Sequence, residues 1–295
     1  MLGVLGATSL VAISARPVTP GATGTSRVAV AAEEPVLSPA QVRDRAFSSR
    51  ALNRDMRYLV YLPRGYETST TRYPVLYMLH GLGDDYRQWE RLGLLDTASD
   101  LISRGAIPPM IIVLPQGDRG YWVDHVDDGP QYGTYVSRDL VSHIDAQYRT
   151  RAERGARAIG GLSMGAHGAL DLALTNPEEF GVAGGHSLAL RRMENALEFF
   201  GTPENWTAHD PPSLMKARSA APGAARPMAM WIDIGDDDPW AAPNAKFHTQ
   251  LTADGVPHQW RARPGKHDHA YWASHVEEYL RFYGNALAED LAPRG

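Results

Sequence analysis

The chain has 295 residues, of which 43% are hydrophobic and 21% charged, the composition of a soluble globular protein. Its formal net charge of -5 and its isoelectric point near 6.1 offer no basic footprint for nucleic acid, so no such partner is expected. The absence of cysteine excludes disulfides, thiolate metal sites and a cysteine nucleophile. A chain of this length can build one large core, and we expect a single domain over residues 36–295.

Residues 1–35 differ from the rest of the chain. Residues 1–15 are apolar and uncharged, and residues 16–32 are rich in Pro, Thr, Ala and Gly. This pattern is typical of the apolar part of an export signal followed by a flexible linker, with residues 29–31 (Ala-Val-Ala) as the cleavage site. No Lys or Arg precedes the apolar run, so both a secreted or periplasmic protein and a cytoplasmic one with an incorrect start stay open. The run is shorter than the ~20 residues of a membrane-spanning helix, so no stable membrane anchor is expected.

Beyond residue 35, short apolar runs alternate with amphipathic segments. Apolar residues four positions apart, such as Val136, Leu140 and Ile144, predict a helix. Strands that alternate with helices predict a mostly parallel sheet covered by helices on both faces, with the functional loops at the carboxyl ends of the strands. In chain order, we expect strands at 56–62, 73–79 and 110–114, a helix at 132–148, strands at 157–159 and within 181–190, a strand at 228–234, a helix at 242–254, a strand at 258–262 and a helix at 271–283.

The segment GGLSMGAHGAL, from Gly160 to Leu170, places a serine between two glycines where a predicted strand meets a helical pattern. A strand that reverses sharply into a helix strains the serine, and Gly161 and Gly165 avoid the collisions that side chains would cause there. A G-x-S-x-G pattern alone is a weak signal. The strand before it and the small-residue helix after it make it typical of a nucleophile elbow, so Ser163 is the candidate nucleophile.

An acid is expected to follow a later strand of the same sheet. The apolar run 228–234 leads into a loop that contains Asp236, Asp237 and Asp238. We take Asp238 as the candidate acid. Asp236 and Asp237 stay open as alternatives, although both also suit a solvated loop.

A histidine should then follow the last strand. The run 258–262 is followed by the loop 264–269, which contains His267 and His269. We take His267 as the candidate base and keep His269 as the alternative. His80, which precedes the loop after an earlier strand, is interpreted as structural.

Four segments in this order resemble one family. They are HGLGDD from His80, GGLSMGAHGAL around Ser163, G-x-x-D from Gly235 to Asp238, and PGKHDHAYW from Pro264 to Trp272. The chain resembles the α/β-hydrolase superfamily, within it the esterase D-like branch with S-formylglutathione hydrolases, feruloyl and other carbohydrate-ester esterases, and mycolyltransferases. The resemblance covers about residues 45–285. It departs beside the candidate base, where Lys266 and His269 replace the Gly and Trp usual in that branch.

The resemblance implies an α/β-hydrolase fold and a serine carboxylesterase that forms an acyl-enzyme on Ser163, with Asp238 and His267 completing a triad. It favours Asp238 over the other aspartates. The backbone N–H groups of Leu82 and Met164 are the expected oxyanion hole. The substrates would be small-molecule or carbohydrate esters, feruloyl or acetyl esters among them, and no cofactor is implied.

Two other functions stay open. An acyltransferase would use the same triad with an alcohol in place of water. A binding protein without turnover is disfavoured, because it would have no physical reason to keep a strained serine. An S-formylglutathione hydrolase is also disfavoured, because the loop after His80 lacks the cysteine typical of that group.

Three tryptophans beside these loops are candidate substrate-binding residues: Trp122, Trp240 and Trp272. Trp122 lies in the aromatic and acidic segment 121–129, where a wall of the substrate cleft and packing on the core are equally open. The other two adjoin the candidate acid and base. The acids and histidines here match neither a metal-ligand spacing nor a calcium loop, so no metal is expected.

Overall fold

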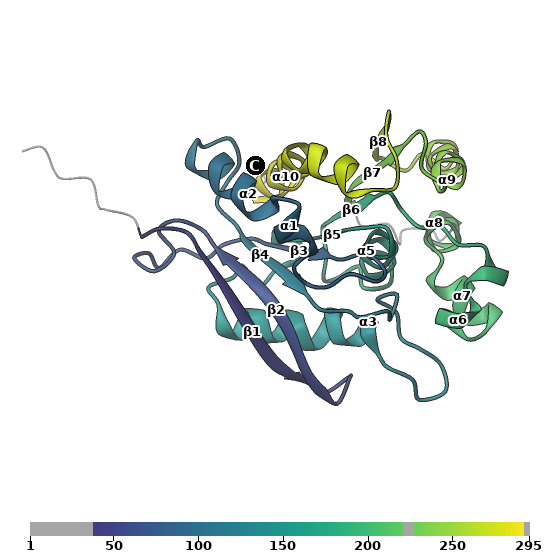
Figure 1. Cartoon of the computed structure of the whole chain (residues 1–295), viewed down its shortest axis with the longest axis horizontal. Helices are drawn as coiled ribbons and strands as arrows, with labels where there is room; N and C mark the ends of the chain where they lie inside the picture. The colour runs from purple at the N-terminus through teal and green to yellow at the C-terminus, as the bar shows by residue number, and fades with distance from the viewer. Residues whose placement is uncertain (1–37, 221–226, 292–295) are drawn as a thin grey trace, which may run out of the picture. The chain divides into compact units, whose positions relative to one another are not determined.

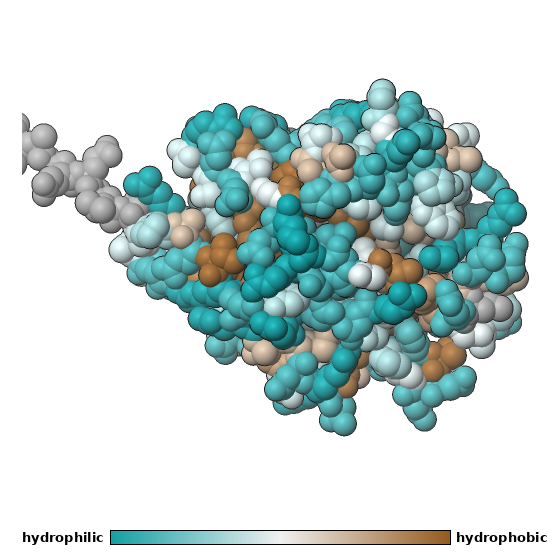
Figure 2. Space-filling view, in the orientation of Figure 1, coloured by the Kyte–Doolittle hydropathy of each residue, from teal (hydrophilic) through white to brown (hydrophobic). Residues whose placement is uncertain are grey.

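The computed structural model describes residues 38–220 and 227–291. The signal-like segment, the linker, the Ala-Val-Ala site at 29–31 and the expected domain boundary after residue 35 all lie outside these ranges. Within them, no helix is both long and apolar enough to cross a membrane. On the face shown in Figure 2, hydrophobic residues form small patches separated by hydrophilic ones.

Eight strands form one sheet in the order β1-β2-β4-β3-β5-β6-β7-β8 (Figure 1). The β1–β2 and β2–β4 pairs are antiparallel and all the others are parallel, which confirms the predicted mostly parallel sheet. The strands are β1 (Gln41–Ser49), β2 (Arg54–Leu62), β3 (Val75–Leu79), β4 (Ile111–Pro115), β5 (Arg157–Leu162), β6 (Val182–His186), β7 (Ala229–Gly235) and β8 (Gln259–Arg263).

Helices cover both faces of this sheet (Figure 1). Helices α1, α2 and α10 contribute to one hydrophobic cluster, and α3, α4, α5, α8 and α9 contribute to the cluster on the other face. The helices are α1 (Gln88–Arg91), α2 (Leu94–Ser103), α3 (Tyr132–Thr134), the π-helical turn η1 (Tyr135–Leu140), α4 (Val141–Gln147), the 3-10 turn η2 (Arg154–Ala156), α5 (Met164–Thr175), the 3-10 turn η3 (Met193–Asn195), α6 (Leu197–Phe200), α7 (Pro203–His209), α8 (Pro211–Ala220), α9 (Ala241–Ala253) and α10 (His269–Leu291).

The predicted elements are present with shifted ends. The third strand begins at Val75 rather than at residue 73, and the last helix extends over His269–Leu291 rather than 271–283. The helix expected over 132–148 is interrupted by the π-helical turn η1. Strand β1 and helices α1, α2, α6, α7 and α8 were not predicted from the sequence.

Helix α10 lies directly on the sheet because two strand residues are glycines. A Cβ atom at Gly160 or Gly184 would come within 2 Å of the Tyr283 hydroxyl, so no other residue fits there while that tyrosine keeps its place. This close packing holds α10 and, with it, the loop that precedes α10.

The order of the strands indicates where a ligand site is expected. The chain passes from β3 to β4 on one side, whereas β5 leads to β6 on the other side. The carboxyl ends of β3 and β5 therefore lie at the topological switch point, where open α/β sheets bind their ligands. His80 follows β3 and Ser163 follows β5.

Candidate active site

Ser163 occupies the sharp turn between β5 and α5, with φ 55° and ψ -116°. This backbone conformation is rare for a residue with a side chain. A Cβ atom at Gly161 would lie 2.3 Å from the backbone of Gly165, and one at Gly165 would lie 2.3 Å from the Leu79 carbonyl oxygen. Both flanking positions therefore require glycine, and the serine side chain projects from a turn that the surrounding backbone fixes.

Hydrogen bonds connect Ser163, His267 and Asp238 in a chain. The Nε2 atom of His267 lies 2.8 Å from the Ser163 Oγ, and Nδ1 lies 2.7 Å from the Asp238 Oδ2. The other carboxylate oxygen of Asp238 accepts a hydrogen bond from the Trp240 backbone N–H at 2.8 Å. The Asp238 side chain is fully buried, while that of His267 is 22% exposed. An imidazole that donates from Nδ1 to a buried carboxylate presents Nε2 as an acceptor for the serine hydroxyl proton.

The alternative acid and base residues have other positions. Asp236 accepts a hydrogen bond from the Gly265 backbone N–H at 3.1 Å, and Asp237 lies 3.6 Å from the Lys266 Nζ. Both aspartates are exposed, and so is His269, the first residue of α10. The structure thus brings Asp238 and His267 to Ser163, and uses Asp236 and Asp237 to hold the neighbouring loop.

The acid and base loops also touch through their backbones. The Asp236 N–H donates to the Arg263 carbonyl at 2.7 Å, and the Asp237 N–H donates to the Gly265 carbonyl at 2.9 Å. A Cβ atom at Gly235 would lie 2.4 Å from the Gly265 oxygen, so the two loops are as close as glycine allows. The distance between Asp238 and His267 is therefore set by the backbone.

A buried polar network that the sequence analysis missed lies beneath these loops. The Asp233 carboxylate accepts hydrogen bonds from His186 Nδ1, the Trp231 indole and the Tyr271 and Tyr279 hydroxyls, at 2.6 to 2.9 Å. Burial opposes the ionisation of Asp233, but the interaction with His186 and the other donors outweighs it and lowers the pKa of Asp233. Tyr271 follows His267 by four residues, so this network anchors the base loop. The sequence signal that could have indicated this network is Asp233 itself, an acid inside the apolar run 228–234.

The loop after β3 is held by the buried ring of His80. Its Nδ1 donates to the Gly81 carbonyl at 2.8 Å, and its Nε2 accepts from the Gly117 backbone N–H at 2.9 Å. Burial lowers the pKa of His80, which agrees with the neutral ring that this pattern of donors requires. The structural interpretation of His80 agrees with these contacts.

This loop also lies against the serine. A Cβ atom at Gly81 would be 3.5 Å from the Ser163 Cβ, and the Gly81 N–H donates to the Gln88 side chain at 2.8 Å. Leu82 comes next in the loop, and Met164 is the first residue of α5. The two backbone segments expected to supply the oxyanion hole thus flank Ser163. Gln88 was missed, although it lies within the segment that begins with HGLGDD.

The three tryptophans have different surroundings. Trp122 is completely buried, and its indole donates to the His80 carbonyl at 3.2 Å. Of the two roles that the sequence left open, the structure therefore supports packing on the core and not the wall of the substrate cleft. Trp272 is 7% exposed, and its ring meets that of His267 edge to face at 5.1 Å, so it supports the base. Trp240 is half-buried and lines an open cleft of about 570 Å³.

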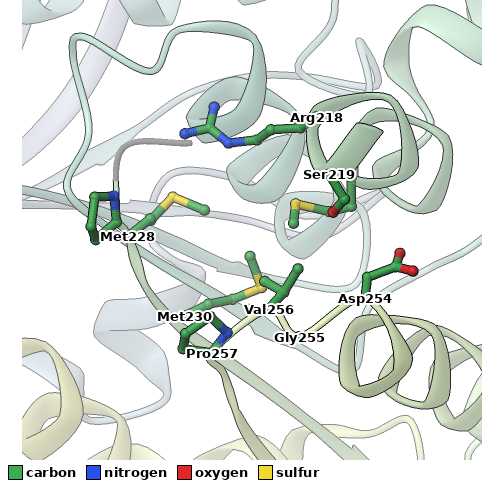
Figure 3. A pocket seen from close by; sticks show the side chains of 10 residues that line it. Arg218, Ser219, Met228, Met230, Asp254, Gly255, Val256 and Pro257 are labelled. Atoms are coloured by element: carbon green, nitrogen blue, oxygen red, sulfur yellow. The ribbon is translucent and has the colours of Figure 1, made fainter. Parts of the chain in front are cut away.

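A second pocket, of about 290 Å³, lies elsewhere (Figure 3). Met228 and Met230 line it from the start of β7, whereas Asp238 follows the end of that strand. A strand of seven residues separates the two regions by roughly 20 Å. This apolar pocket is therefore not the space beside Ser163. Among the described residues, no group of three or more His, Cys, Asp or Glu side chains is arranged to hold a metal ion.

His167, one turn along α5 from Ser163, allows a prediction about stability. Its Nε2 donates to the His209 carbonyl at 2.8 Å, and burial lowers the pKa of His167 to about 4. In the unfolded chain a histidine titrates near ~6.5, so the unfolded state binds this proton more readily than the folded state. The contribution of His167 to stability is therefore lost as the pH falls below ~6.5, by roughly 2 kcal/mol at pH 5 relative to pH 7.

The variant His167→Gln should remove this pH-dependent contribution. The unfolding free energy of the variant minus that of the wild type should rise by roughly 2 kcal/mol between pH 7 and pH 5, as measured by urea denaturation. The neighbouring Asp171 and His209 pair is present in both proteins, so the difference reports the proton of His167 together with its coupling to His209. A difference that stays constant between the two pH values would contradict the prediction.

The comparison with known proteins agrees with the geometry of the candidate site. The family model described as "Putative esterase" matches residues 49–283. A curated esterase of Mycobacterium tuberculosis is 29% identical over 260 residues, which cover 75% of this chain and 54% of that protein. The chain thus spans about half the length of that relative.

Other similar proteins point to the same fold. An endo-1,4-beta-xylanase/feruloyl esterase of Xylanibacter ruminicola is 34% identical over 133 residues, 42% of this chain and 18% of that protein. A solved ferulic acid esterase has a TM-score of 0.75 at 29% identity, over 84% of this chain and 99% of that one. An S-formylglutathione hydrolase of Staphylococcus aureus, at 21% identity, has a TM-score of 0.69 over 82% of this chain and 98% of that one. These structures share the α/β-hydrolase fold expected from the sequence.

Proposed function

The chain belongs to this family of carboxylic ester hydrolases, and from that premise we propose that it hydrolyses esters through an acyl-enzyme on Ser163. The observation that carries the proposal is the hydrogen-bonded chain from Ser163 through His267 to Asp238, at distances of 2.8 and 2.7 Å. These three residues follow three different strands of the sheet, β5, β7 and β8. Only the fold brings them together, at the edge where such sheets bind ligands.

Each residue has a role in this proposal. The Ser163 Oγ attacks the ester carbonyl while His267 Nε2 accepts its proton, and the buried Asp238 holds the ring and stabilises the imidazolium. The protonated His267 then donates to the leaving alcohol. Water repeats the sequence on the acyl-enzyme and releases the acid.

The developing oxyanion needs donors that are in place before the reaction. The backbone N–H groups of Leu82 and Met164 are the proposed pair, and removal of one such donor typically costs ~3 kcal/mol of transition-state stabilisation. The neutral His80 ring and the Gln88 side chain support this role, because they fix the backbone on either side of Gly81. Preorganised donors of this kind need no rearrangement during the reaction.

The proposed substrates are small esters and acyl esters of carbohydrates. The relatives described as a ferulic acid esterase and as an endo-1,4-beta-xylanase/feruloyl esterase support an aromatic acyl group joined to a sugar. Acetyl esters of carbohydrates are included, because the same chemistry acts on a shorter acyl group.

Covalent labelling tests the proposal directly. A fluorophosphonate probe should modify Ser163 alone, as mapped by peptide mass spectrometry, and should abolish hydrolysis of p-nitrophenyl acetate. Methyl ferulate and acetylated xylan, assayed beside p-nitrophenyl esters of increasing chain length, should then rank the acyl groups. Labelling at another residue, or full turnover by the labelled protein, would refute the serine mechanism.

A further inference from the structure

The open cleft beside Trp240 contains a cation whose position is fixed. The Arg191 Nε donates to the Tyr121 hydroxyl at 2.8 Å. Its guanidinium carbon also lies 5.7 Å from the centre of the Tyr121 ring, 5.3 Å from that of Phe199 and 5.7 Å from that of Trp240. Aromatic faces stabilise a cation at such distances, so Arg191 is held in place before any ligand arrives.

Within residues 38–220 and 227–291, this cation has no carboxylate partner. No Asp or Glu side chain of these ranges forms an ion pair with Arg191, and its side chain donates a hydrogen bond to a neutral tyrosine. Burial raises the pKa of Tyr121, which keeps that phenol uncharged. The guanidinium fork can pair with a planar anion through two parallel hydrogen bonds.

Two hydrogen bonds connect the residues of the cleft and their neighbours to the candidate triad. In the first, the Ala189 N–H donates to the Ser163 carbonyl, and Arg191 is only two residues farther along. In the second, Trp240 donates its backbone N–H to Asp238. Two residues span at most ~7 Å of chain, so the backbone of Arg191 lies within roughly 10 Å of the Ser163 carbonyl oxygen.

The other charged residues of the cleft differ from Arg191 in their exposure to solvent. Arg192, Glu194 and Glu198 also line it, but all three are exposed and belong to a surface segment. Exposed charges are screened by water and salt, and long side chains there can turn away from a ligand. The half-buried, fixed charge of Arg191 therefore dominates recognition in the cleft.

We propose that this cleft is a substrate subsite in which Arg191 binds a carboxylate carried by the ester, while Trp240 packs against the adjoining ring or chain. This inference rests on the proposed esterase function. The carboxylate can belong to the acyl part, as in a hemi-ester of a dicarboxylic acid, or to the alcohol part, as in an acylated uronic acid. Both sources present the same planar anion to the same guanidinium.

Matched substrates separate the two sources. For the acyl part, 4-nitrophenyl hemiglutarate is compared with the uncharged 4-nitrophenyl pentanoate. For the alcohol part, 4-acetoxybenzoate is compared with 4-acetoxybenzamide. In at least one pair, the wild type should show a kcat/KM ratio of charged to neutral ester that exceeds that of Arg191→Gln by about tenfold or more, because a hydrogen bond between two charged groups is stronger than one between neutral groups.

Two further measurements separate binding from a general effect of charge. Arg50→Gln makes the same charge change at an exposed residue that does not line the cleft, and it should keep the wild-type ratio within about twofold, because a distant exposed charge contributes little. Raising the salt concentration should lower the ratio of the wild type more than that of Arg191→Gln. Circular dichroism and the melting temperature of each variant report whether the fold is retained, and Arg191→Lys keeps a charge there if Arg191→Gln does not fold.

The outcomes distinguish this inference from the esterase proposal. If the neutral esters are hydrolysed at Ser163 but neither pair shows a ratio that depends on Arg191, the carboxylate subsite is refuted and the esterase stands. Equal losses of the ratio in Arg191→Gln and Arg50→Gln would also refute it. If the wild type hydrolyses none of the four esters, both proposals fail.

Discussion

Ser163→Ala is expected to lower kcat for p-nitrophenyl acetate by about 10⁶, the loss typical when the nucleophile of a serine triad is removed. The substitution deletes only the Oγ that lies 2.8 Å from His267 Nε2. Alanine fits the turn, since its Cβ takes the place of the serine Cβ, so the elbow should keep its shape. The measurement is steady-state turnover, with circular dichroism to confirm the fold.

An exposed serine offers a matched control for this loss. Ser142 lies on α4 and its side chain is exposed, so Ser142→Ala makes the same chemical change away from the three bonded residues. That variant should keep wild-type turnover. Substantial activity in Ser163→Ala, with its fold intact, would show that another group performs the attack.

The elements that could be predicted from the sequence are those whose burial is visible locally, as a run of apolar residues. Strands β3, β4 and β5 are buried along their whole length, and a strand covered on both faces is mostly apolar, with the ion-paired Arg157 at the start of β5 as an exception. Strand β1 escaped prediction because it is an edge strand whose side chains are mostly exposed or half-buried. Its sequence, QVRDRAFSS, has charged residues where a buried strand would have apolar ones.

The missed helices have a related explanation. Helix α7 contains no buried residue, and α1 has only four residues, too few to show a helical period. Their positions depend on contacts with distant parts of the chain rather than on a local pattern. Helix α2 was not predicted either, although its buried residues occur at helical spacing in the sequence.

The residues of the candidate site likewise divide into those that a local motif predicts and those whose surroundings only the fold determines. Ser163, Asp238 and His267 could be proposed because each lies in a short motif directly after a strand. Trp122 could not be assigned from the sequence to the cleft or to the core, because its burial depends on Gly117 and Gly168, where a Cβ atom would collide with the indole. Contacts of this kind join distant segments and leave no local signature.

The partners of Asp233 and of Arg191 could not be derived from the sequence for the same reason, although Asp233 itself stands out as an acid inside an apolar run. Tyr271 and Tyr279 reach Asp233 across 38 and 46 residues of the chain. Arg191 reaches Tyr121 across 70 residues. Neither set of partners forms a motif, and only the packing of α10 and of the segment after β6 brings them together.

Asp238→Asn is expected to lower kcat by about 10⁴, the loss seen when the carboxylate that orients a catalytic histidine becomes an amide. The Asp238 Oδ2 accepts the Nδ1–H of His267 at 2.7 Å, and an amide nitrogen in that place would offer a second donor. The ring would then favour the tautomer with its proton on Nε2, which cannot accept the proton of Ser163. The loss should appear in kcat more than in KM, because the carboxylate does not touch the substrate.

The neighbouring aspartates provide controls with the same chemical change. Asp236 and Asp237 are exposed and hold the loop through Gly265 and Lys266, so Asp236→Asn and Asp237→Asn should each cost less than about tenfold in kcat. Stopped-flow or steady-state kinetics on all three variants, with melting temperatures, compare them directly. Equal losses at the three positions would mean that the loop as a whole, rather than the bond from Asp238 to His267, controls the reaction. A loss confined to position 238 requires an interaction that only this carboxylate makes, and the bond to Nδ1 of His267 is the one that the two exposed aspartates lack.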